Sequence, residues 1–199
     1  MRATLLGLSL IAGFAFTGAA LADMALNPNH SAPIAPLSGM ILYHNPQMHF
    51  AIAYPPRWTV DAKFTNDTLG PDKAIHGVSF TISPERIKGT NLAGDTRLSV
   101  ETLPGSCDAS RFLSNPQDAK TMTEAGRTYS YATANDAAAG NRVEETVYAL
   151  SGTSPCLAVR YFIHYAVLEN YDPGTVKAFD RAALMKTFGR MRRSMAVMK

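Results

Sequence analysis

Three polar side chains, Glu144, Arg160 and His164, are of types that can form a ligand-binding or catalytic site. Glu144 lies in one expected strand, and the other two residues lie in the next strand along the chain. If Leu150 pairs with Cys156 across the turn between these strands, Glu144 lies diagonally from Arg160 on one face of the sheet. A carboxylate, a guanidinium and an imidazole on a partly covered sheet could line a pocket, where burial would shift their pKa values.

The more ordinary interpretation of this group is a structural ion pair beneath a helix or loop. The interpretation as a site depends on the strand register, because successive side chains of a strand point to opposite faces of the sheet. A shift of the pairing by one residue would move Glu144 away from Arg160 and dissolve the group.

The sequence contains no recognised catalytic or metal-binding motif. It has neither G-x-S-x-G nor H-E-x-x-H, and His44, His49 and His76 lack the short spacing of metal ligands. We therefore expect no metal, no cofactor and no enzymatic activity. A catalytic triad can still assemble from distant residues. The alternative is therefore a small exported enzyme of the hydrolase type, with its site near the same Glu, Arg and His.

Cys107 and Cys156 are the only two cysteines of the chain. An isolated pair in an oxidising compartment most often forms a disulfide, whereas a catalytic thiol or half of a metal site is the alternative. Pro-Gly-Ser precedes Cys107 and a proline precedes Cys156, and such turns suit a structural bridge. We predict a disulfide between the two residues.

The first 22 residues are typical of a secretory signal peptide. Arg2 precedes an apolar stretch from Leu5 to about Leu21, and an A-x-A sequence ends at Ala22. A transmembrane anchor is the alternative, but glycines interrupt the stretch and it is only about as long as a short span. We predict cleavage after Ala22 and a soluble product that is periplasmic or secreted. We expect no membrane span in the rest of the chain.

Charge and length limit the class of protein. The formal net charge is +3, and loss of Arg2 with the signal peptide would lower it by one. A nearly neutral chain argues against a nucleic-acid-binding protein, which needs a basic face. Residues 23–40 have the composition of a flexible linker, and residues 41–199 have the length of a single domain.

The hydrophobic pattern predicts an α+β fold. The stretch 156–168 is apolar at every odd position from Leu157 to Val167 and half-apolar at the even positions, which is typical of a strand inside a sheet. From Pro173 onward, apolar residues recur at steps of three and four, as in an amphipathic helix. We expect an antiparallel β-sheet of about six to seven strands flanked by helices, with a long C-terminal helix. Basic residues near the end of that helix are either solvated or available to a membrane or an acidic partner.

The segment from Phe50 to Pro55, Phe-Ala-Ile-Ala-Tyr-Pro, together with Trp58, resembles the opening segment of the PsbP-like superfamily. The helix over 179–194 fits the same superfamily, whose fold is shared with a Ran-binding nuclear import factor. The likeness covers residues 41–198 in layout, and it extends to exported bacterial proteins with a similar cysteine pair. It implies a binding or assembly module of the bacterial cell envelope, with another envelope protein as its partner.

Overall fold

The computed structural model describes residues 37–198. The predicted signal peptide of residues 1–22, the cleavage site after Ala22, and residues 23–36 lie outside the described residues. Within the described part of the chain, no helix has the length and apolar character needed to cross a membrane.

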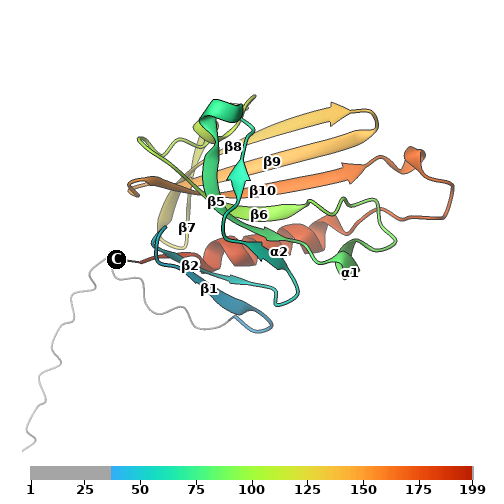
Figure 1. Cartoon of the computed structure of the whole chain (residues 1–199), viewed down its shortest axis with the longest axis horizontal. Helices are drawn as coiled ribbons and strands as arrows, with labels where there is room; N and C mark the ends of the chain where they lie inside the picture. Colours follow the sequence, from blue (N-terminus) through green and yellow to red (C-terminus); the bar gives the residue numbers. More distant parts are fainter. Residues whose placement is uncertain (1–36, 199) are drawn as a thin grey trace, which may run out of the picture. The chain divides into compact units, whose positions relative to one another are not determined.

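Most of the strands form one antiparallel sheet (Figure 1). Its eight strands are β3 (Thr59–Asp61), β4 (Thr65–Asn66), β5 (Ile75–Thr81), β6 (Arg97–Leu103), β7 (Lys120–Glu124), β8 (Arg127–Ala138), β9 (Asn141–Leu150) and β10 (Cys156–Ala166). The order is β3-β5-β6-β10-β9-β8-β7. The short strand β4 also pairs with β5, along a different part of it from β3. The strand predicted to lie inside a sheet is β10, which is hydrogen-bonded to β6 on one side and to β9 on the other.

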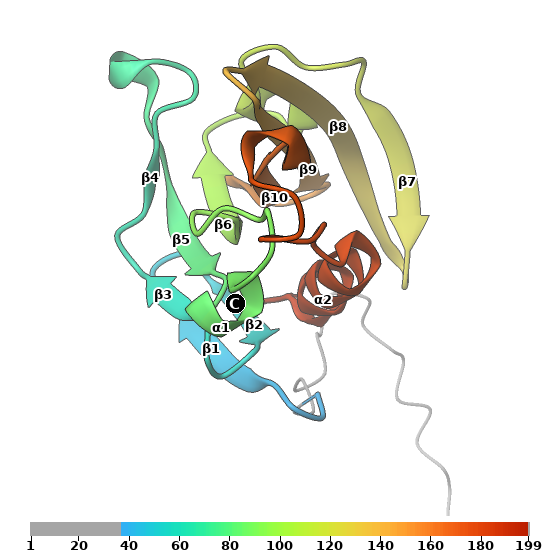
Figure 2. The same ribbon diagram turned by 90° about the vertical axis from the view of Figure 1, so that its right-hand side faces the viewer.

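A second, three-stranded sheet and several helices complete the fold. The small sheet contains β1 (Ile41–Asn45), β2 (Phe50–Tyr54) and β11 (Ala196–Val197), in the order β1-β2-β11. The helices are α1 (Pro84–Ile87) and α2 (Arg181–Ser194), with short 3₁₀ helices η1 (Pro71–Lys73), η2 (Ala109–Phe112) and η3 (Leu168–Asn170). Figure 2 shows α2 and the small sheet on the same side of the large sheet.

The two faces of the large sheet bury separate apolar clusters. One face packs against α2 and the small sheet, and its cluster includes Phe80, Val159 and Phe188. The other face packs against η2, and its cluster includes Phe112 and Ala158. Strand β10 contributes to both clusters because its odd and even side chains point to opposite faces.

The expected α+β class is confirmed, but the expected count of six to seven strands is too low. Strands β3, β4 and β11 contain only two or three residues, so no alternation of polar and apolar residues can show in the sequence. The C-terminal helix begins at Arg181 and not at Pro173, because Gly174 has a positive φ of 81° and breaks the helical path. The side chain of Asp180 caps the helix by accepting a hydrogen bond from the N–H of Ala183 at 2.9 Å.

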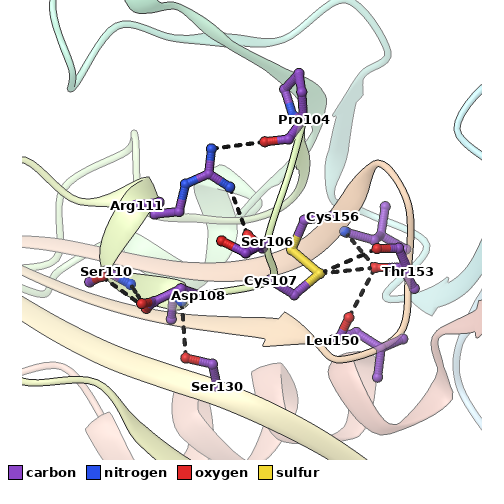
Figure 3. The surroundings of a disulfide bond; sticks show 12 residues. Pro104, Ser106, Cys107, Asp108, Ser110, Arg111, Ser130, Leu150, Thr153 and Cys156 are labelled. Atoms are coloured by element: carbon purple, nitrogen blue, oxygen red, sulfur yellow. Dashed lines mark hydrogen bonds between the residues drawn. A yellow bond between two sulfur atoms is a disulfide. The ribbon is translucent and has the colours of Figure 1, made fainter.

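Cys107 and Cys156 form a disulfide, as the sequence predicts (Figure 3). Cys156 is the buried first residue of β10, and Cys107 lies in the segment that leads into η2. The bridge therefore ties η2 to the central strand of the sheet. The two residues are separated by 49 positions in the sequence, so the bridge closes a long loop.

Replacing both cysteines by serine should lower the free energy of unfolding. A loop of this length predicts a loss of roughly 4 kcal/mol at most, because the unfolded chain regains the freedom that the bridge removes. Unfolding by guanidinium chloride would measure the difference between the oxidised protein and the double variant. A reductant should destabilise the wild type and leave the double variant unchanged, and equal stability of the two proteins would contradict the prediction.

Candidate functional site

The predicted register between the two site-bearing strands is wrong by one residue. Leu150 pairs with Leu157 and not with the cysteine before it, so Arg160 lies opposite Val147. The side chain that shares a face with Arg160 is therefore that of Glu145, not Glu144.

A threonine side chain in the β9–β10 turn fixes this register. The hydroxyl of Thr153 donates to the carbonyl oxygen of Leu150 and accepts from the N–H of Leu157, both at 2.9 Å. It thus joins the first paired residues of the two strands (Figure 3). The sequence could not show which hydroxyl makes these bonds, because Ser151 and Ser154 offer hydroxyls in the same turn.

Arg160 is fully buried on the face that packs against η2. Its Nε and Nη2 atoms each lie 2.9 Å from an oxygen of Glu101, which is also fully buried and comes from β6. Its Nη1 pairs with Glu145 of β9, and Nη2 also donates to the carbonyl oxygen of Phe112 in η2. One guanidinium therefore links three strands and a helix.

Glu101 has further donors that complete this buried network. The hydroxyl of Ser99 donates to its Oε1 at 2.6 Å, and the side-chain amide of Asn66 donates to the same atom at 3.3 Å. Burial lowers the pKa of Arg160, but the charge and hydrogen bonds of Glu101, and then those of Glu145, outweigh burial and raise it. The guanidinium is charged, satisfied and inaccessible, so the structural ion pair is the interpretation that fits Arg160.

The other two residues of the predicted group lie elsewhere. Glu144 points to the opposite face, where the hydroxyl of Tyr165 donates to it at 2.9 Å and Arg181 at the start of α2 pairs with it. His164 lies near the far end of β10. Its Nδ1 is 2.9 Å from Asp95 Oδ1, and its Nε2 is 3.2 Å from Asn141 Oδ1. Glu144, Arg160 and His164 are therefore not brought together.

The second buried arginine is also engaged inside the protein. Arg192 of α2 is 4% exposed, and its Nε donates to the hydroxyl of Tyr161 at 2.9 Å. Its Nη2 lies 2.6 Å from Glu124 of β7, and its guanidinium lies 4.2 Å from the ring centroid of Tyr148. These contacts attach the end of α2 to the edge of the sheet and serve packing.

An open pocket lies where the β1–β2 turn, the β9–β10 turn and β11 meet. Its volume is about 320 Å³, compared with about 70 and 270 Å³ for two pockets beside Trp58. We call it the turn pocket. It is lined by Gln47, Met48, His49, Thr102, Gly152, Thr153, Ser154, Pro155, Leu157, Val197 and Met198. It combines apolar side chains with a few polar groups, which is typical of a ligand-binding site.

Local hydrogen bonds hold the walls of the turn pocket in place. The side-chain oxygen of Asn45 accepts from the N–H of Met48 at 2.9 Å, which fixes the β1–β2 turn. His49 has a positive φ of 53°, and its carbonyl oxygen accepts from the N–H of Met198 at 2.7 Å. On the other side, Thr153 and the disulfide hold the β9–β10 turn. The turns that line the pocket are thus held by contacts within the protein itself.

No spacing rule could have identified the turn pocket from the sequence. Its residues come from four distant parts of the chain, and only the turn sequences around Pro46 and Pro155 mark two of its walls. Among residues 37–198, no group of three or more His, Cys, Asp and Glu side chains is placed to hold a metal ion.

Comparisons with known proteins reveal a likeness of fold. No family model and no curated protein sequence matches the chain. The fold is similar to that of a cyanobacterial PsbP. This protein, CyanoP from Synechocystis, is 14% identical with a TM-score of 0.44, over 85% of this chain and 99% of CyanoP.

A protein from Bacteroides thetaiotaomicron is 12% identical with a TM-score of 0.47, over 82% of this chain. The chain spans only 50% of the length of that protein. Both likenesses concern the fold alone and assign no functional residue.

Removing Glu101 should destabilise the protein more than removing Glu145. Glu101→Ala leaves the buried guanidinium of Arg160 without its two-point partner, a kind of loss that costs about 3–5 kcal/mol. Glu145→Ala should cost less, because the Glu145 side chain is 11% exposed and Glu101 still holds the guanidinium. Equilibrium unfolding in guanidinium chloride measures both losses.

Glu169→Ala is the matched control, because Glu169 is exposed in η3. It should change the stability by less than either of the other substitutions. A larger loss for Glu145→Ala than for Glu101→Ala would show that the bidentate pair is not the main stabilising contact of Arg160.

Proposed function

We propose that this chain is an exported binding or assembly module of the bacterial cell envelope, and that it holds a partner protein at the turn pocket. The observation that carries the proposal is the turn pocket itself, with its apolar side chains, its polar groups and its hydrogen-bonded turns. Such a surface favours binding over catalysis, because it contains no pair of ionisable side chains that could exchange a proton.

The alternative of a small exported hydrolase has less support. It needs Glu144, Arg160 and His164 in one place, and these three side chains have separate partners. Arg160 is sealed in the core. The ring nitrogens of His164 face Asp95 and Asn141, neither of which is an activated nucleophile of a hydrolase triad.

The export part of the proposal rests on the sequence and on the disulfide. Residues 1–22 have the pattern of a signal peptide, and a structural disulfide persists in an oxidising compartment. In this proposal residues 1–22 are removed, residues 23–40 form a flexible N-terminal segment, and residues 41–199 form the binding domain. The product is periplasmic or secreted.

Cleavage should leave Asp23 as the first residue of the exported protein. N-terminal sequencing of the protein from the envelope fraction of its own cells measures this directly. Ala22→Arg should block cleavage and cause the precursor to accumulate, because the small side chain at the end of A-x-A is needed. Wild-type protein that retains residues 1–22 would contradict the prediction.

Filling the turn pocket should abolish partner binding. Thr102 lines the pocket opposite Leu157, so Thr102→Trp should block it. Affinity capture from the cell envelope, followed by mass spectrometry, should recover a stoichiometric protein with the wild type and lose it with this variant. Thr121→Trp on β7 is the matched control, because Thr121 is an exposed strand threonine that does not line the pocket.

If Thr102→Trp retains the partner, the partner binds at a surface other than the turn pocket. If mild crosslinking yields no partner with the wild type, the binding module itself is contradicted.

A further inference from the structure

The turn pocket brings together three side chains with soft or borderline metal-binding atoms. Met48 and Met198 each offer a thioether sulfur, and His49 offers an imidazole nitrogen. His49 is exposed, and both methionines are half-buried, with Met48 also packed against the core cluster on the α2 face of the large sheet. By contrast, Met191 and Met195, near the end of α2, are fully buried in the core.

The strand pairing places Met198 beside His49. Strand β11 pairs with β2 so that Val197 lies opposite Phe50. The ladder continues by one residue, because the N–H of Met198 donates to the carbonyl oxygen of His49 at 2.7 Å. The backbones of Met198 and His49 are therefore hydrogen-bonded neighbours.

Met48 joins this pair through the shape of the β1–β2 turn. Adjacent residues of a regular strand point to opposite faces, but His49 has a positive φ of 53° and leaves the strand conformation. Met48 and His49 consequently line the same pocket. The hydrogen bond from the Met48 N–H to Asn45 holds the turn in this conformation.

The chemistry of the lining selects a soft monovalent metal. Thioether sulfur favours Cu(I), whereas Mg²⁺ and Ca²⁺ require carboxylate and carbonyl oxygens. The lining of the turn pocket contains no carboxylate and no cysteine. Both cysteines of the chain are joined in the disulfide, so no thiolate competes for the metal.

We propose that Met48, His49 and Met198 bind one Cu(I) ion in the turn pocket. The site is three-coordinate, with two thioethers and one imidazole. The Cu(I) site rests on the proposed function only because both the metal and the partner protein would bind at the turn pocket. Met48 and His49 are far from Met198 in the sequence, which is why their spacing indicates no metal site.

Cu(I) binding can be measured on the full chain, expressed with its own N-terminal segment and purified in the oxidised form. Competition with bicinchoninate under ascorbate gives the affinity and the stoichiometry for Cu(I). Titration with Ag(I), a redox-inert substitute, should shift the methyl resonances of Met48 and Met198 in ¹³C-methionine-labelled protein. We expect one equivalent to bind and an excess of Zn(II) not to displace it.

Three variants remove one donor each: Met48→Leu, Met198→Leu and His49→Asn. Leucine keeps the volume of methionine, and asparagine tolerates the positive φ of His49. Loss of even an outer-shell partner weakens a metal site roughly 10–100-fold. We expect each of these substitutions, which removes a direct ligand, to weaken Cu(I) binding by at least as much. Met185→Leu on α2 is the matched control, because Met185 is half-buried outside the turn pocket, and it should bind like the wild type.

Absence of Cu(I) binding by the folded wild type would overturn the proposal, as would binding that Met48→Leu and Met198→Leu leave unchanged. These results can be distinguished from the test of the binding module. Loss of the partner by Thr102→Trp, with no Cu(I) bound by the wild type, would support the binding module and contradict the metal site. Cu(I) binding by the wild type through these donors, with the partner kept by Thr102→Trp, would support the metal site and contradict the proposed docking position.

Discussion

The ion pair between Arg160 and Glu101 is the contact on which the large sheet depends. A charge in an apolar face is tolerated only when partners neutralise it and fill its hydrogen-bonding positions. Here those partners come from β6, from β9 and from the carbonyl oxygen of Phe112 in η2. A shift of either neighbouring strand by one residue would remove a carboxylate and leave the guanidinium buried without it. The pair thus stabilises the observed register of β6, β9 and β10, together with the Thr153 hydrogen bonds in the β9–β10 turn.

The disulfide and the turn pocket lie at the same end of β10. Cys156 begins β10 and Thr153 closes the turn before it, so the wall of the pocket is continuous with the core. Across the pocket, β11 follows directly after α2 and pairs with β2. The pocket is therefore formed by elements that packing already holds, and not by a free loop.

The sequence predicted what depends on periodicity and failed where single hydrogen bonds decide. The uninterrupted apolar positions of β10 identified it as an interior strand, and the cysteine pair indicated the bridge. Glu144 and Glu145 are adjacent, so alternation alone could not show which of them meets Arg160. The hydroxyl of Thr153 decides that question. The turn pocket was beyond prediction, because its lining is assembled from segments that have no common spacing.

The edges of the large sheet have a consequence for behaviour at high concentration. Its outer strands are short: β7 has five residues and β3 has three. Lys120 and Glu124 lie at the two ends of β7, and Asp61 ends β3. Short strands with charged ends are poor templates for adding a strand from another molecule. These two edges of the large sheet are therefore protected against pairing with a strand of another molecule.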